Sequence, residues 1–167
     1  MAGITHALVA DGTPLVDDGD WNDDHVVTLA FGQYRRTSGN YTISSATFTD
    51  IDGTNLSFTV TTGARRVKMS FAGSVLCGAT ANQQIFLDVT VDGTRQGGTV
   101  GLVGFRNAND TTQRRFNGSF TYLTDVLSAG SHTFKFQWAA ASGTATIEAD
   151  GSANSPRWWV EETFFST

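Results

Sequence analysis

Short runs of alternating apolar and polar residues make up most of the chain, and this period of two is typical of strands with one buried face. Runs of this kind cover residues 56–60, 67–77, 85–91, 116–122, 132–138 and 145–149. Turn-forming pairs separate the runs, and Asp92-Gly93 favours a two-residue hairpin because both residues tolerate a positive φ. No window of the chain shows a long helical face. The pattern therefore predicts about seven to ten short strands in a sandwich, a barrel or a jelly roll.

The last run, residues 157–165, is apolar on both faces. One face carries Trp158, Val160 and Phe164, and the other carries Trp159 and Phe165. A strand that is apolar on both faces must be covered on both. We expect the core of the domain to cover one face, and either a neighbouring subunit, a loop or the N-terminal segment to cover the other.

Charge divides the chain into two parts. Residues 1–30 contain six acidic residues and no Lys or Arg, whereas residues 31–167 contain ten acidic and eleven basic residues. We therefore predict an acidic N-terminal arm over residues 1–30 and a nearly neutral domain over residues 31–167. A nearly neutral domain does not favour binding to nucleic acid, which requires a basic surface.

Composition narrows the class of protein further. Cys77 is the only cysteine, so an intramolecular disulfide cannot form, and the apolar run around it predicts a buried thiol. The first residues lack the features of a secretory signal, and no segment approaches the ~20 apolar residues of a membrane span. We expect a protein that stays in the cytosol of the cell that makes it and has no membrane partner.

One acidic segment has part of a calcium-binding pattern. Asp18, Asp20 and Asn22 have the spacing of the first three ligands of an EF-hand loop. Asp23 then stands where the loop requires glycine, and Leu29 stands where it requires glutamate. We interpret the segment as a solvated acidic stretch, or one that docks onto a basic surface, and expect no bound metal ion.

The residues needed for catalysis are also not arranged in a recognisable pattern. The three histidines, His6, His25 and His132, show no metal-binding spacing, and the nucleophile motif G-x-S-x-G is absent. We therefore expect no catalytic residues and no cofactor, and we interpret His132 as a structural histidine at the start of a strand.

The sequence GDWNDDHVV, residues 19–27, resembles a motif of the form D-W-N-x-x-H-V that occurs near the N-terminus of many phage virion proteins. The residues that fit the motif are Asp20, Trp21, Asn22, His25 and Val26. This resemblance implies that the arm attaches the protein to a phage particle through these residues.

Residues 127–162 carry a second resemblance. The segments LSAGSHTFKFQW, SGTATIEADG and SPRWWVEE resemble the closing strands of phage jelly-roll domains that are similar to the C1q and tumour-necrosis-factor fold. The resemblance implies an all-β antiparallel sandwich of the jelly-roll type that forms a homotrimer, with aromatic strands near the threefold axis. The interface residues predicted on this basis are Tyr122, Trp158, Trp159, Phe164 and Phe165.

Taken together, these features favour a non-enzymatic structural protein of the bacteriophage virion, assembled in the host cytoplasm. We expect a trimeric capsid decoration or head-fibre protein that binds the major capsid protein, or another virion protein, through its arm and stabilises the shell. The alternative is a receptor-binding module of a tail fibre or spike, in which Phe105 and polar loops recognise a host glycan. The loops considered are Gly39–Asn40, Thr80–Gln84 and Arg106–Gln113. A free-standing bacterial binding protein or enzyme is the third hypothesis.

Overall fold

Strands and turns make up the part of the chain that the structure describes. The computed structural model describes residues 31–108, 111–151 and 154–163. These residues form twelve strands and no helix: β1 Phe31–Arg35, β2 Tyr41–Ile43, β3 Thr49–Asp50, β4 Ser57–Thr62, β5 Val67–Cys77, β6 Gln84–Val91, β7 Thr94–Arg95, β8 Val103–Arg106, β9 Arg114–Leu123, β10 Gly130–Ala140, β11 Ala145–Ile147 and β12 Arg157–Glu162. In the same residues there is no helix of the length and hydropathy needed to cross a membrane.

Several sequence predictions fall on residues that lie outside this description. They are the arm over residues 1–30, with Asp20, Trp21, Asn22, His25 and Val26, and the two interface residues Phe164 and Phe165.

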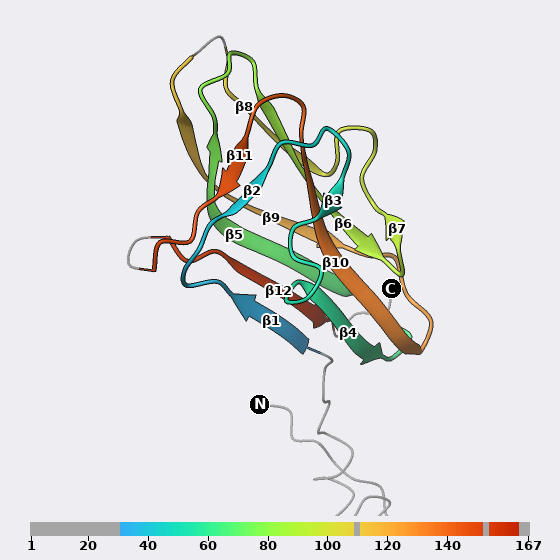
Figure 1. Ribbon diagram of the computed structural model, residues 1–167. Coiled ribbons are helices and arrows are strands. Elements are labelled where there is room, and N and C mark those ends of the chain that lie inside the picture. The colour runs from blue at the N-terminus through green and yellow to red at the C-terminus, as the bar shows by residue number, and fades with distance from the viewer. Residues whose placement is uncertain (1–30, 109–110, 152–153, 164–167) are drawn as a thin grey trace, which may run out of the picture.

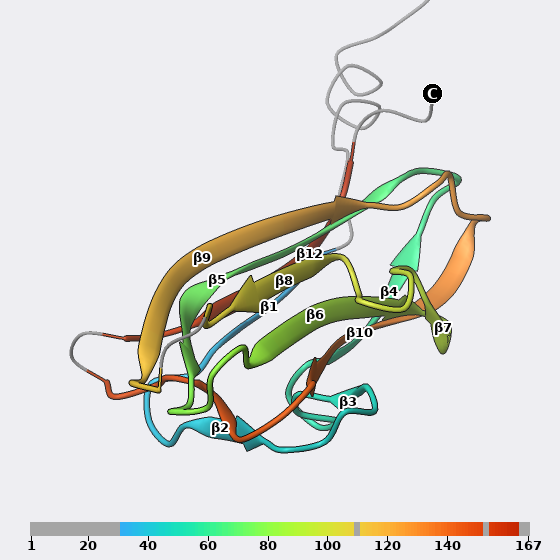
Figure 2. The same ribbon diagram turned by 90° about the horizontal axis from the view of Figure 1, so that it is seen from above.

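The strands pair in two antiparallel sheets (Figure 1). In the first sheet the order is β1-β12-β5-β11-β2, and β9 pairs with the other edge of β5. In the second sheet the order is β3-β10-β6-β7, with β4 beside β10 and β8 beside β6. Figure 2 shows the two layers from above, with β9, β5 and β12 in one and β6, β10 and β4 in the other. The arrangement is a sandwich of the jelly-roll type, and the predicted fold class is confirmed.

Strand β5 organises the first sheet. One edge of β5 pairs with β9 from Lys68 to Cys77. The other edge pairs first with β12 and then with β11, which lie end to end along it. Residues of β5 alternate between the core and the outer face, as the pattern over residues 67–77 predicted. The buried apolar members are Val67, Met69, Phe71, Val75 and Cys77.

The inner faces of the two sheets form one hydrophobic core. Its large, fully buried side chains include Phe134 and Phe136 of β10, Ile85 and Leu87 of β6, Phe71 and Met69 of β5, and Trp158 of β12. The Trp158 ring contacts the rings of Tyr34, Tyr41 and Phe71, at centroid distances of 6.2, 5.9 and 5.4 Å. Burying one apolar side chain of this size stabilises the fold by about 1.5–3 kcal/mol. Trp158 therefore holds β12 and β1 onto the core.

The predicted hairpin at Asp92-Gly93 joins β6 to β7. Both residues have positive φ values, 49° and 81°, which is why Asp and Gly are suited to these positions. The turn is tied to β10, because the Asp92 N–H donates to the carbonyl of Thr133 at 2.8 Å and the Asp92 carboxylate accepts the N–H of Thr133 at 2.8 Å.

Candidate interaction surface

A groove runs along β1 and β12 on the outer face of the first sheet. Its volume is about 840 Å³, and its lining includes Phe31, Gln33, Arg35, Ala72, Arg157, Trp159 and Glu161. The groove lies on the sheet face that the second sheet does not cover.

Strand alternation places the two tryptophans of β12 on opposite faces. Trp158 is fully buried in the core. Trp159 is half-buried on the outer face, between Gln33 of β1 and Ser70 of β5. The Trp158 side chain packs inside the core and offers no surface to a neighbour, so the structure gives no support to its predicted place at a subunit interface. Within the described residues, part of the Trp159 side chain is open on the outer face.

Two more large apolar side chains are exposed on the same face. Phe31 is 52% exposed and Leu123 is 47% exposed. They lie at the two ends of one row of residues that crosses β1, β12, β5 and β9. Along this row the order is Phe31, Glu161, Lys68 and Leu123. Glu161 and Lys68 form an ion pair in the middle of the row. Phe31 and Leu123 are therefore the exposed apolar side chains at the two ends of this row, with a charged pair between them.

The groove also contains two arginines without an acidic partner. Arg35 lies directly opposite Arg157 in the β1–β12 register, so both side chains point to the same face. The Arg35 guanidinium donates to the hydroxyl of Ser155 at 3.2 Å. Within the described residues, neither arginine forms an ion pair with a carboxylate. Like charges opposite each other are destabilising, so this end of the groove favours an anionic group on whatever covers it.

Tyr122, the remaining predicted interface residue within the description, lies on a different surface. It is on the inner face of β9 and is half-buried, and its hydroxyl donates to the side-chain carbonyl of Gln96 at 2.8 Å. Burial raises the pKa of this hydroxyl. Tyr122 therefore joins the edge of the sandwich to the loop after β7, and only part of its ring is open to a neighbour.

The loops considered for glycan recognition are only partly brought together. The Asn107 N–H donates to the carbonyl of Gln83 at 2.9 Å, and the Arg106 guanidinium donates to the Asn82 side chain at 2.8 Å, so two of the three loops adjoin. The third loop lies elsewhere, where the Asn40 side chain accepts the N–H of Ala149. Phe105 is half-buried against Phe116, with ring centroids 5.7 Å apart.

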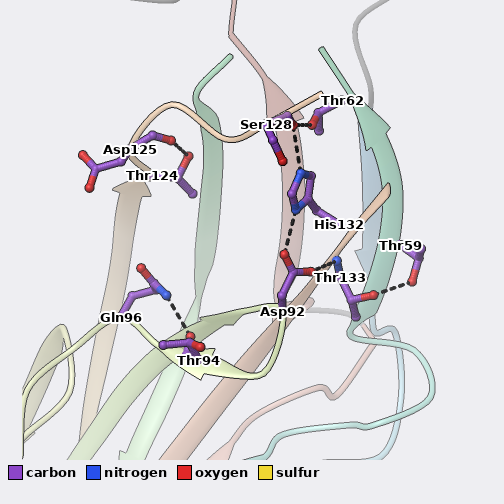
Figure 3. Close-up of polar contacts among 10 residues, drawn as sticks. All are labelled: Thr59, Thr62, Asp92, Thr94, Gln96, Thr124, Asp125, Ser128, His132 and Thr133. Carbon is purple, nitrogen blue, oxygen red and sulfur yellow. Dashed lines mark hydrogen bonds and ion pairs between the residues drawn. The ribbon is translucent and has the colours of Figure 1, made fainter. Parts of the chain in front are cut away.

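A separate polar cluster joins the β6–β7 turn to the segment between β9 and β10 (Figure 3). His132 points toward Asp92 on one side and Ser128 on the other. Its Nδ1 lies 2.7 Å from the Asp92 carboxylate, and its Nε2 lies 2.9 Å from the Ser128 carbonyl oxygen. The hydrogen bond to Asp92 and that to Ser128 raise the pKa of His132. Sequence analysis identified His132 as structural but gave no sign of these partners, which lie in other segments.

The cluster contains the residue types of a catalytic triad but not its arrangement. Ser128 meets His132 through its main-chain carbonyl oxygen, so its hydroxyl is not the group that the imidazole contacts. A triad requires the histidine to accept a proton from the nucleophile. In this contact Nε2 instead faces an acceptor, and the geometry is that of a structural clamp.

The remaining reactive groups are buried or dispersed. Cys77 is fully buried, and burial raises the pKa of its thiol to about 11, which keeps it in the unreactive protonated form. Across residues 31–108, 111–151 and 154–163, no group of three or more His, Cys, Asp or Glu side chains is placed to hold a metal ion.

Comparison with known proteins adds a structural likeness. No family model matches the chain, and no curated protein matches it. Among solved structures, it is similar to the crystal structure of the infectious bursal disease virus VP2 subviral particle, with 15% sequence identity and a TM-score of 0.27. The alignment covers 80% of this chain and 38% of the VP2 chain. The chain thus spans well under half the length of that protein.

Proposed function

We propose that the protein is a non-enzymatic structural component of a bacteriophage particle, a trimeric capsid decoration or head-fibre protein attached through residues 1–30. One observation carries this proposal: an acidic arm with the D-W-N-x-x-H-V pattern precedes a jelly-roll domain with its own core. The buried apolar side chains of the described residues all lie between Tyr41 and Val160. The described residues therefore form a hydrophobic core among themselves.

This division suits attachment by an extended segment. An arm that becomes ordered on binding gains contact area without a core of its own. Trp21 would supply the aromatic contact, since aromatic residues dominate such interfaces. The six acidic residues of the arm would direct it to a basic surface of the major capsid protein or another virion protein. Binding only to the assembled shell would stabilise the shell by mass action.

We also propose that the subunits of the trimer meet through the outer face of the first sheet. Phe31, Trp159 and Leu123 are the apolar groups that this face offers. A contact in a threefold ring joins two different patches of neighbouring subunits, so the face need not be complementary to itself. The neighbour would have to bring carboxylates to Arg35 and Arg157, because unpaired charges are costly to bury.

Attachment can be tested with purified particles that lack the protein. The full chain and a chain lacking residues 1–25 are mixed with the particles and sedimented, and bound protein is located by gold-labelled antibody to residues 31–167. We expect the full chain to label heads and the truncated chain to stay folded but unbound. Equal binding by both chains would contradict anchoring by the arm. Label confined to tail tips would contradict decoration and favour host recognition.

A further inference from the structure

His132 has a hydrogen-bond acceptor on each ring nitrogen. A neutral imidazole has one N–H and one lone pair, so it can donate to only one of two acceptors. The imidazolium form donates from both nitrogens and satisfies the Asp92 carboxylate and the Ser128 carbonyl together. The His132 side chain is only 11% exposed, so water has limited access to replace a lost contact. The arrangement therefore favours the charged form.

The other charged groups near His132 are engaged elsewhere or exposed. From the segment after β9, Asp125 is fully exposed and lies 3.7 Å from Arg66. From the β4–β5 turn, the Gly63 N–H donates to Glu162, and the Arg65 N–H donates to the carbonyl of Gly63. On β10 itself, Lys135 points to the opposite sheet face and pairs with Asp50 at 2.8 Å. Asp92 is the charged side chain that contacts the imidazole directly.

We propose that His132 is a pH-dependent latch, which holds residues 128–129 against the β6–β7 turn when protonated and releases them at Ser128 when it loses its proton. The proposal concerns the domain alone and goes beyond the virion role. The hydrogen bond to Asp92 persists on deprotonation, because a carboxylate is the stronger acceptor. Asp92 is also held in place by the main chain of Thr133. The lone pair of Nε2 then faces the Ser128 oxygen, and the two repel.

The released segment has few other attachments on the side of Ser128. Its first half is held firmly, because the Thr124 N–H donates to the carbonyl of Val67 at 3.0 Å and the Leu127 N–H donates to the carbonyl of Arg65 at 3.0 Å. Beyond Leu127, the Thr62 hydroxyl contacts the Ser128 carbonyl at 3.5 Å, which is a long hydrogen bond. Deprotonation therefore loosens residues 128 and 129, between the main-chain bond of Leu127 and the start of β10, where Gly130 pairs with Thr62.

The direction of the pH effect follows from the same contacts. The two acceptors raise the folded-state pKa of His132 above the ordinary value of 6.5. The latch is therefore fully closed below about pH 6.5 and opens as the pH rises through the raised pKa. The neighbouring carboxylate shows the matching effect, since the hydrogen bond from His132 lowers the pKa of Asp92.

Two measurements on the full chain test the latch. NMR titration of the imidazole Cε1 protons, with His132 assigned by its absence in His132→Gln, gives the midpoint for this residue. The amide chemical shifts of residues 128 and 129, followed over the same titration, report opening. The His132→Gln variant serves as the reference for pH-dependent shift changes that do not come from His132. Asp92→Asn is the second variant, because Asn tolerates the positive φ of the turn.

We expect a His132 midpoint above 6.5 and amide shift changes at residues 128 and 129 with the same midpoint. In Asp92→Asn the midpoint should fall toward 6.5, and in His132→Gln these shift changes should be absent. A midpoint at or below 6.5 would overturn the proposal. So would wild-type amide shifts that parallel those of His132→Gln. Neither result depends on particles, so failure of the latch is distinguishable from failure of the proposed virion role.

Discussion

The ion pair between Asp88 and Arg95 offers a quantitative test of how the second sheet is held together. The Asp88 side chain is completely buried. One of its oxygens accepts hydrogen bonds from Nε and Nη2 of Arg95, at 2.8 and 2.7 Å. The other oxygen accepts hydrogen bonds from the main-chain N–H groups of Val89 and Gly97, at 2.8 and 2.9 Å. The Arg95 guanidinium also lies over the ring of Phe48, 3.6 Å from its centroid. The pair joins β6 to β7, and the Gly97 N–H joins the loop after β7 to the same carboxylate.

Replacing Arg95 with Gln should leave Asp88 as a buried charge with only its two main-chain donors. Removing one partner of a buried pair lowers the free energy of unfolding by about 3–5 kcal/mol. We expect Arg95→Gln to lie near the lower end of this range, because two main-chain N–H groups still donate to Asp88. A loss of about 3 kcal/mol corresponds to a fall in Tm of roughly 6–12 °C for a chain of this size. Urea unfolding and calorimetry, at one fixed protein concentration, would measure both quantities.

Lys135→Gln is the matched control for Arg95→Gln, because it breaks a partly exposed pair with Asp50, on the outer face of the second sheet and away from the proposed subunit contact. The two side chains of that pair are 35% and 26% exposed, and exposed pairs contribute about 0–1 kcal/mol. The double variant Asp88→Asn with Arg95→Gln should recover part of the loss, since no buried charge remains. If Arg95→Gln were no more destabilising than Lys135→Gln, the reasoning that burial makes this pair indispensable would be refuted.

Three further outcomes follow from other contacts. In the Leu123→Asp background, in which the proposed subunit contact is lost, Trp158→Ala should lower the free energy of unfolding by about 3–5 kcal/mol and Trp159→Ala by much less, as measured by urea unfolding; similar losses would contradict their placement on opposite faces. Although burial opposes it, hydrogen bonds from Asn55, Tyr41 and Thr54 hold the pKa of Asp52 well below its usual range. The stability that the ionised Asp52 carboxylate adds is present above about pH 3.8 and is lost as the pH falls further. Thermal melts of Asp52→Asn should therefore show a smaller loss of stability on acidification than melts of the wild type. Leu123→Asp should reduce the mass measured by light scattering from trimer to monomer, and an unchanged trimer would place the subunit contact elsewhere.

The sequence predicted the strands that carry a clear alternation. The run at residues 67–77 became β5 with those bounds, and the Asp92-Gly93 pair became the β6–β7 turn. These features depend on neighbouring residues only, because a strand with one buried face shows its period locally. Shorter strands such as β3, Thr49–Asp50, carry too few residues to show a period.

Features that depend on pairing between distant strands could not be read in the same way. Arg35 lies opposite Arg157, and Asp92 lies beside His132, yet each pair is far apart in the chain. The sequence also showed that the last strand is apolar on both faces without showing which face is inner. That is why Trp158 and Trp159 were both expected at an interface, whereas the structure buries Trp158 in the core.

The pairing of β1 also determines how the domain would carry a mechanical load. Residues 1–30 join the domain at Phe31. Among the strands that the structure describes, β1 is hydrogen-bonded to β12 alone, with five facing residue pairs from Phe31 and Glu161 to Arg35 and Arg157. A pull along the strand direction would shear all these pairs at once, whereas a pull across it would open them one after another from Phe31. A tether leaving along the axis of β1 would therefore resist force better than one leaving at right angles to it.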